Sequence, residues 1–301
     1  MKKLFYAVVL IFLSIGLVFY FFTLQTFQQI EIARMKWAGV SSIVDTNFHY
    51  FEKNNCTDEK NCQCVLLIHG LGDFALTWRN MLSEPKSSFA KNIHFFAPNL
   101  PGSLSSPKLK SQDDYNVQNM ARLVSEAFIP KCDSWIVVGN SYGGWMAVFM
   151  ALNLKQIKGL LLLAPAGLKK DYGYLTDYFL NPTVEGARGF YKKLYYNPKD
   201  VPDFIFERVV TRLKTQTVIE QLKSITNADY LELHLPRIQI PVSYVWGDAD
   251  QVIPAEWSES YVRATPNSHY KLLKNCGHVP QKECFSEVLS ELNALLLQAV
   301  P

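Results

Sequence analysis

The 301-residue chain is long enough for one large domain with an insertion, and its composition limits the partners it can have. Apolar side chains make up 49% of the residues, which suits a buried core and argues against disorder. The formal net charge is +3 and only 19% of the residues are charged. No dense basic surface is expected, and this excludes nucleic acid as a predicted partner.

The chain opens with an apolar segment. Residues 4–22 carry only Ser14 and Gly16 among apolar side chains. At about 1.5 Å per residue, a helix of this length spans roughly 28 Å, enough to cross the hydrocarbon core. No small-x-small cleavage site follows, so we expect an uncleaved transmembrane anchor over residues 1–24, with a long signal peptide as the alternative. The lysines before the segment favour a cytoplasmic N-terminus and a body on the extracytoplasmic side, periplasmic or lumenal.

Residues 25–37 mix polar and apolar side chains and predict a juxtamembrane helical linker, followed by a domain over residues 38–301. Within that domain, Cys56, Cys62 and Cys64 crowd one loop, and in an oxidising compartment Cys56 could pair with either of the other two. A metal site built from this trio would need a fourth ligand, and no His or Cys lies nearby in the sequence. The sequence therefore predicts no metal.

Short apolar runs alternate with segments of helical period through the domain. The runs cover residues 65–68, 93–96, 135–138, 160–163, 242–246 and 270–273, and residues 41–51 roughly alternate like an opening strand pair. Most runs lack alternation, as expected for strands buried on both faces of a parallel sheet. Apolar stripes at 117–128 and 285–296 predict helices between them. The pattern predicts an α/β fold in which helices flank both faces of a mostly parallel sheet.

The alternation breaks at about residues 168–235. This stretch holds seven of the fifteen tyrosines, together with four phenylalanines. Aromatic-rich helices inserted between two core strands predict a cap over a site. The alternative is a helical subdomain with a core of its own.

A nucleophile motif follows the third of these runs. Gly139-Asn140-Ser141-Tyr142-Gly143 lies between the strand at 135–138 and a helical segment at 145–154. A glycine-flanked serine in a sharp strand-to-helix turn is a nucleophile elbow, in which the turn exposes the serine hydroxyl. We therefore predict that Ser141 is a nucleophile.

A serine hydroxyl needs a base to take its proton and a carboxylate to hold that base in the useful tautomer. His278 lies between glycine and proline in a loop after the last predicted strand, where it could reach the elbow, and is the predicted base. Asp248 and Asp250 both follow the strand at 242–246, and either fits the order serine, acid, histidine. Asp250 is preferred, because the acid of this kind of fold usually lies three residues beyond the glycine that ends the strand.

Two backbone N–H groups must stabilise the oxyanion of the tetrahedral intermediate. Tyr142, directly after the nucleophile, is expected to supply one of them. His69-Gly70-Leu71-Gly72 closes the first buried run, and Leu71 is expected to supply the other. On this interpretation, His69 is part of the predicted oxyanion loop and is not a second candidate for the base. Asp73 either steadies the loop or is a solvated turn acid.

With these elements in view, the chain resembles the α/β-hydrolase superfamily, and more narrowly its membrane-anchored monoacylglycerol lipases and bacterial lipases. Besides the triad, the resemblance includes residues 164–168, 246–252 and 272–278. One departure is the loop from Asn99, where many relatives have Asp first and Gly in place of Leu104. This loop is expected to be shaped differently, which bears on substrate selection.

The resemblance implies a serine hydrolase that cleaves carboxylic esters, lipid-like ones such as monoacylglycerols, without metal or organic cofactor. The expected partners are a small-molecule ester or lipid and the membrane, and the oligomeric state is left open. Two alternatives remain: a hydrolase of the same fold that cleaves carbon-carbon bonds, and a non-catalytic hydrolase-like binding domain. The second would predict a damaged triad.

Overall fold

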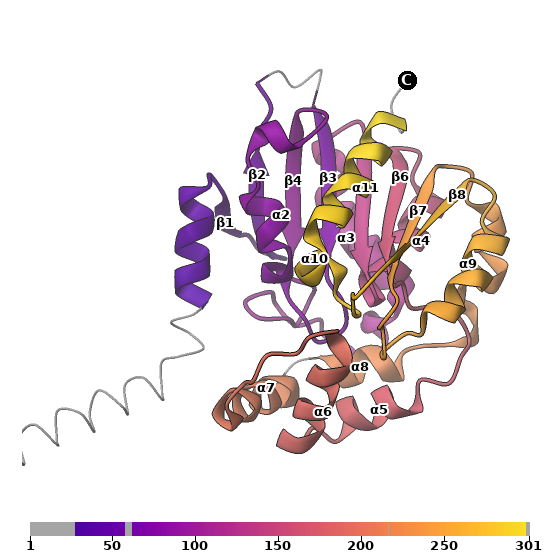
Figure 1. Cartoon of the computed structure of the whole chain (residues 1–301). Coiled ribbons are helices and arrows are strands. Elements are labelled where there is room, and N and C mark those ends of the chain that lie inside the picture. The colour runs from indigo at the N-terminus through magenta and orange to yellow at the C-terminus, as the bar shows by residue number, and fades with distance from the viewer. Residues whose placement is uncertain (1–27, 58–61, 216, 299–301) are drawn as a thin grey trace, which may run out of the picture.

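The computed structural model describes residues 28–57, 62–215 and 217–298, and its centre is one sheet (Figure 1). Eight strands of the described chain follow the order β1-β2-β4-β3-β5-β6-β7-β8. The strands are β1 (Ser41–Val44), β2 (His49–Asn54), β3 (Gln63–Ile68), β4 (Ile93–Pro98), β5 (Trp135–Asn140), β6 (Ile157–Leu163), β7 (Val242–Gly247) and β8 (Ser268–Leu273). The β1–β2 and β2–β4 pairs are antiparallel and all the others are parallel. The predicted mostly parallel α/β sheet is confirmed.

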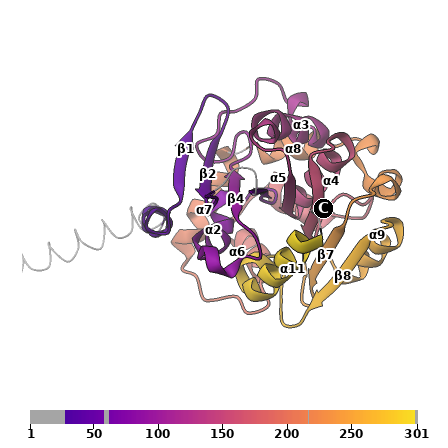
Figure 2. The same ribbon diagram turned by 90° about the horizontal axis from the view of Figure 1, so that it is seen from above.

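Helices cover both faces of this sheet (Figure 2). One face carries α3 (Val117–Phe128), α4 (Tyr142–Asn153) and α9 (Ser258–Ala264), and the other carries α2 (Arg79–Ser83), α11 (Phe285–Gln298) and the helical residues 28–37. Alternate side chains of β3 enter the two cores, with Leu66 and Ile68 on one face and Val65 and Leu67 on the other. This two-sided burial is why the central runs are continuously apolar.

Four helices follow β6 and lie beyond one end of the sheet, at the bottom of Figure 1. They are α5 (Gly173–Leu180), α6 (Val184–Leu194), α7 (Asp203–Thr215) and α8 (Val218–Lys223). Phe206 and Val210 of α7 pack on Ala187 of α6 in a small core of their own. Phe179 and Leu213, in contrast, pack with Leu71 of the body. These helices, called the cap below, thus have both a private core and an interface with the predicted oxyanion loop.

Short helical segments complete the fold. They are η2 (Ala75–Trp78), η3 (Lys86–Ser88), η4 (Asp113–Tyr115), η5 (Ile129–Lys131), η6 (Asn227–Asp229), η7 (Leu231–Leu233), η8 (Leu235–Arg237), η9 (Ala255–Trp257) and α10 (Pro280–Glu283). Within the described ranges, no helix is both long and apolar enough to span a bilayer. The anchor predicted over residues 1–24 lies outside the described residues. The domain boundaries, including those of the cap, stay predictions.

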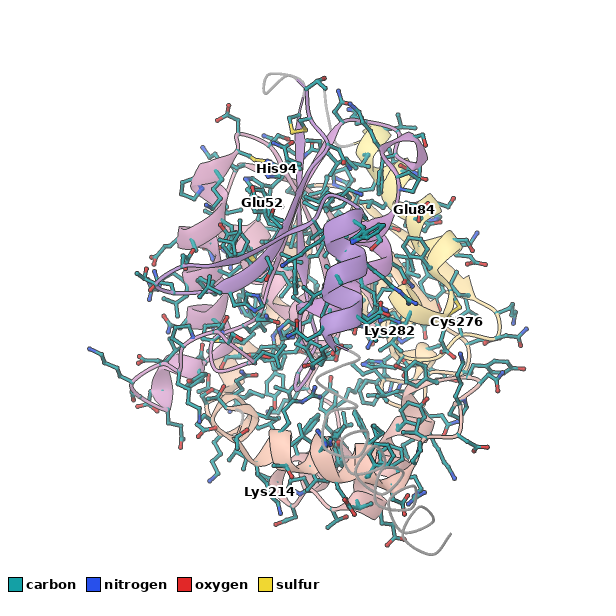
Figure 3. All side chains as sticks on the ribbon, turned by 90° about the vertical axis from the view of Figure 1, so that its left-hand side faces the viewer. Glu52, Glu84, His94, Lys214, Cys276 and Lys282 are labelled. Atoms are coloured by element: carbon teal, nitrogen blue, oxygen red, sulfur yellow. A yellow bond between two sulfur atoms is a disulfide. The ribbon has the colours of Figure 1, made fainter. Side chains whose placement is uncertain are left out.

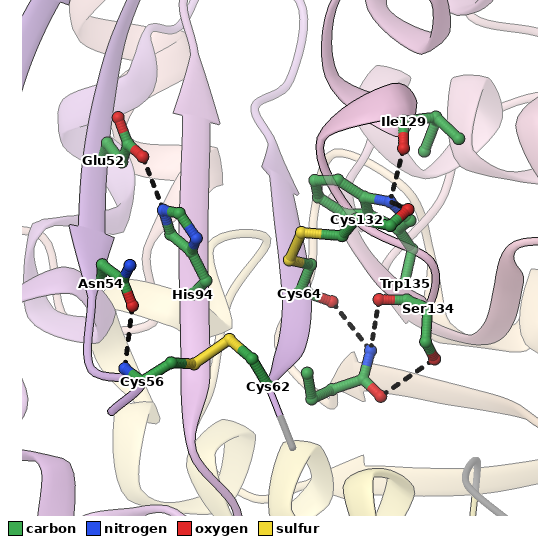
Figure 4. The surroundings of a disulfide bond; sticks show 11 residues. Glu52, Asn54, Cys56, Cys62, Cys64, His94, Ile129, Cys132, Ser134 and Trp135 are labelled. Atoms are coloured by element: carbon green, nitrogen blue, oxygen red, sulfur yellow. Dashed lines mark hydrogen bonds and ion pairs between the residues drawn. A yellow bond between two sulfur atoms is a disulfide. The ribbon is translucent and has the colours of Figure 1, made fainter. Parts of the chain in front are cut away.

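All six cysteines are in disulfides: Cys56–Cys62, Cys64–Cys132 and Cys276–Cys284. The first is one of the two pairings left open by the sequence. A possible further ligand that is distant in the sequence does lie near this loop, because β4 brings His94 beside Cys62 and Cys64 (Figure 4). These sulfurs are bonded to other cysteines, however, and His94 Nε2 lies 2.6 Å from Glu52 Oε1. The cluster accordingly consists of disulfides and a histidine–carboxylate hydrogen bond.

Candidate active site

The turn between β5 and α4 holds Ser141 in a strained conformation. Its φ of 55° and ψ of −117° lie outside the regions that non-glycine residues ordinarily adopt. Its N–H donates to Leu163 O at 3.0 Å, which fixes the turn to β6. A Cβ at Gly143 would lie 2.7 Å from His69 O and closer still to Ile68 O, so only glycine fits there. The sequence pattern and the local geometry agree on an elbow that exposes a half-buried serine.

Asp250 and His278 form a buried pair. Asp250 Oδ2 lies 2.8 Å from His278 Nδ1, with side-chain exposures of 0% and 4%. The other carboxylate oxygen, Oδ1, accepts the N–H groups of Val252 and Ile253, both at 2.8 Å. A carboxylate can only accept, so Nδ1 carries the hydrogen and Nε2 is left with its lone pair. This is the tautomer that a general base requires.

The rival acid, Asp248, lies elsewhere. Its Oδ1 accepts the N–H of Asn275 at 2.8 Å, and its Oδ2 lies 3.5 Å from Lys274 Nζ. The structure therefore brings Asp250, and not Asp248, to His278. Asp248 instead closes the turn after β8.

Backbone and amide contacts hold the histidine loop against the elbow. The N–H of His278 donates to Leu194 O in the cap at 2.8 Å. Asn140 Nδ2 donates to the carbonyl of His278 at 3.0 Å, and Gln281 Nε2 donates to Asn140 Oδ1 at 3.2 Å. Sequence reasoning missed Asn140 and Gln281. The position of Asn140, directly before the nucleophile, was the available signal.

The turn His69 to Gly72 lies against the nucleophile, as an oxyanion loop requires. A Cβ at Gly70 would lie 3.3 Å from Ser141 Cβ. Leu71 and Tyr142, the two predicted donors, line the same cavity as Ser141 and His278. Burial, with the charge of Asp229 added, raises the pKa of the Tyr142 hydroxyl, which keeps that group neutral.

His69 is a structural member of this loop. Its Nε2 accepts the N–H of Leu100 at 3.1 Å, so Nδ1 is the protonated nitrogen and donates to Gly70 O at 2.8 Å. Burial lowers the pKa of His69, which favours the neutral ring that these two bonds need. Both ring nitrogens are occupied, and this agrees with leaving His69 out of the candidate bases.

The departure at Asn99 has a physical reason. Its side chain is buried and bonds in two directions: Oδ1 accepts Ala75 N at 2.7 Å, and Nδ2 donates to His49 Nδ1 at 2.8 Å. An ionised Asp could accept both bonds only if His49 carried its hydrogen on Nδ1, whereas the Asn99 amide donates to a His49 whose Nδ1 is unprotonated. The loop also touches the cap, since Thr217 Oγ1 donates to Pro101 O at 3.1 Å.

A cavity of about 780 Å³ joins these elements beneath the cap. Its walls are mostly apolar and aromatic, and include Leu71, Trp145, Tyr178, Phe179, Phe190 and Leu213. Charged side chains also line it, among them Asp73, Arg212 and Lys282. Nothing in the sequence had pointed to Arg212 or Lys282. A volume of this size suits a lipid-like or drug-sized ligand.

Comparison with known proteins identifies the family and agrees with the fold. Residues 65–291 match the alpha/beta hydrolase family. Lipase 3 of Moraxella sp. (strain TA144) is 27% identical over 81% of this chain and 79% of that protein. The 2-hydroxy-6-oxononadienedioate/2-hydroxy-6-oxononatrienedioate hydrolase 1 of Pseudomonas putida is 23% identical over 80% of this chain and 88% of that protein. The crystal structure of a membrane phospholipase A superimposes with a TM-score of 0.73 at 24% identity, covering 98% of both chains.

Proposed function

We propose that this chain, which belongs to the alpha/beta hydrolase family, cleaves carboxylic esters through an acyl-serine intermediate. Its family and its relatives identify it as a hydrolase. The substrates are lipid-like esters such as monoacylglycerols. The observation that carries the proposal is that His278, held by the buried Asp250, lines the same cavity as Ser141. A lipase among the relatives supports the choice of an ester.

The proposed mechanism uses only side chains and backbone of this chain. His278 Nε2 takes the proton of Ser141 as the hydroxyl oxygen attacks the ester carbonyl. The N–H groups of Leu71 and Tyr142 stabilise the oxyanion. His278 then gives the proton to the leaving alcohol, and water releases the acid by the same steps in reverse. Asp250 keeps the imidazole oriented and stabilises its charged form, so no metal or organic cofactor is needed.

We further propose that the body is anchored at a membrane and lies on its extracytoplasmic side. Two observations support this. The helical residues 28–37, where the described chain begins, contribute Gln28 and Glu31 to the wall of the cavity. The pairing of all six cysteines is typical of an oxidising compartment. An enzyme held there would take a poorly soluble ester directly from the bilayer.

The test is turnover of short- and medium-chain nitrophenyl and glyceryl esters, with labelling by a fluorophosphonate. We expect labelling that depends on Ser141, and Ser141→Ala should lower kcat by on the order of 10⁶ while leaving the melting temperature nearly unchanged. A folded protein that is inactive on every ester tested would refute the proposal.

A second candidate keeps the fold and changes the bond that is cleaved. It is favoured by the relative from Pseudomonas putida, whose name describes a hydrolase of an oxo-dienedioate, and by the Gly-Asn-Ser elbow shared with such enzymes. A panel of esters, amides and diketones separates the two, because a carbon-carbon hydrolase would turn over the diketones faster.

A further inference from the structure

Three charged side chains in the wall of the mostly apolar cavity form a cluster that has no part in the proposed mechanism. Asp73 follows the oxyanion loop, Lys282 lies on α10 and Arg212 lies on α7 of the cap. Lys282 Nζ is 3.5 Å from Asp73 Oδ2. Burying charges is costly unless they are paired, so this cluster calls for a reason.

The cluster carries more positive than negative charge. Burial opposes ionisation of Asp73, but Lys282 and the other nearby cations outweigh it and hold the pKa of the carboxyl below its usual value. Burial likewise opposes the charge of Lys282, yet the Asp73 carboxylate raises the pKa of the amine overall. Arg212 is permanently charged. One carboxylate therefore faces two cations.

The other charged residues of the wall do not supply the missing anion. Glu31 is already shared between two other cations, with Oε1 3.0 Å from Arg34 Nη1 and Oε2 3.4 Å from Arg79 Nε. Lys170 and Asp171 are exposed neighbours of opposite sign at the rim. The excess positive charge thus stays with Arg212 and Lys282.

Arg212 is also short of a hydrogen-bond acceptor. Its guanidinium lies over the ring of Phe74, with Cζ 4.8 Å from the ring centroid. Its Nε is buried and has no hydrogen-bond partner within the described ranges. A buried donor left unpaired costs about 1–3 kcal/mol, and a ligand oxygen would recover this. The planar fork of arginine matches carboxylate and phosphate.

The cluster adjoins the predicted oxyanion loop, because Asp73 directly follows Gly72. The Leu213 side chain, next to Arg212, would lie 3.3 Å from a Cβ at Gly72, and Gly72 precedes Asp73. The same loop meets the nucleophile, since a Cβ at Gly70 would lie 3.3 Å from Ser141 Cβ. An anion bound by Arg212 or Lys282 would therefore lie in the same cavity as Ser141, beside the predicted oxyanion loop.

We propose that Arg212 and Lys282 form a subsite for an anionic group, a phosphate or carboxylate, carried by the ester substrate close to the scissile bond. This inference rests on the proposed ester hydrolysis and narrows its substrate class to anionic esters. Asp73 lies 3.5 Å from Lys282 and offsets one of the two positive charges, so the remaining charge favours an anionic group.

The experiment compares two esters with the same acyl chain: a neutral monoacylglycerol and the corresponding acylglycerol phosphate. Wild type should prefer the phosphate ester in kcat/KM. Arg212→Gln should lower kcat/KM for that ester by about 10- to 100-fold, the worth of a charge-assisted hydrogen bond, and leave the neutral ester nearly unchanged. Lys282→Gln should act in the same direction.

Lys214→Gln is the matched control, because Lys214 is an exposed cation of the same helix α7. Figure 3 shows Lys214 at the far side of the cap and Lys282 where the cap meets the body. The control should preserve the preference for the phosphate ester. Turnover of the neutral ester reports whether each variant is folded.

The outcomes separate the alternatives. Equal losses on both esters in Arg212→Gln would show a structural contact between cap and body, and would overturn the subsite. The subsite would also be overturned if the wild type hydrolysed both esters without preference. Inhibition by inorganic phosphate would not rescue it, because the site would then bind a free anion and not a group of the substrate. If neither ester is hydrolysed, the proposed function itself fails and the subsite fails with it.

Discussion

Replacing Asp250 by asparagine tests how the acid controls the base. Asn has nearly the same shape as Asp, but an amide nitrogen that donates hydrogen bonds replaces one of the two carboxylate oxygens. The two backbone N–H groups that bond Asp250 Oδ1 will select the amide oxygen. The amide N–H₂ must then face His278 Nδ1, which becomes the acceptor and leaves the hydrogen on Nε2. A ring in that tautomer cannot take the proton of Ser141.

The size of the effect follows from these contacts. Turning the amide over would place its donor against two backbone donors and forfeit two hydrogen bonds, at about 1–3 kcal/mol each, so about 2–6 kcal/mol in all. The variant also lacks the negative charge that stabilises the imidazolium. We expect kcat to fall about 10⁴-fold, which corresponds to about 5.4 kcal/mol in the activation barrier.

The assay is steady-state hydrolysis of a soluble nitrophenyl ester, with the melting temperature as a check on folding. Asp248→Asn is the control, because that acid follows the same strand but bonds the N–H of Asn275. It should leave kcat nearly unchanged. The reasoning is refuted if Asp250→Asn keeps more than about a tenth of the wild-type kcat, or if Asp248→Asn loses as much.

Three further predictions concern stability. Gly143→Ala should lower the free energy of unfolding by about 3 kcal/mol, because the added Cβ would overlap the backbone of Ile68. A urea titration measures this, and an unchanged midpoint would contradict the packing argument. Burial lowers the pKa of both His49 and His69, so the folded state favours their neutral forms. Their contribution to stability should be complete above pH 6.5 and should be lost as the pH falls below that value. The melting temperature, measured from pH 8 to pH 5, checks this. A profile that rises toward acid would have the wrong sign. Cys132→Ser removes the disulfide to Cys64, which closes a loop with a sequence separation of 68. The free energy of unfolding should fall by up to about 4 kcal/mol under oxidising conditions and should equal that of the wild type under reducing conditions.

The sequence by itself determined the order of elements and the local shape of the elbow. Both follow from interactions between near neighbours: continuous apolar runs mark strands buried on two faces, and the glycines around Ser141 permit a turn that other residues would block. The same local logic placed His278 and an acid on loops after strands. It could not choose firmly between Asp248 and Asp250, which lie two residues apart.

Only the tertiary structure decided which distant residues meet. The pairing of β3 with β5 places Cys64 opposite Trp135 and so within reach of Cys132. The cap likewise carries Arg212 to the wall of the cavity, where Lys282 lies. No periodicity in the sequence encodes these meetings, because the order of strands in a sheet and the docking of a cap depend on how whole faces pack.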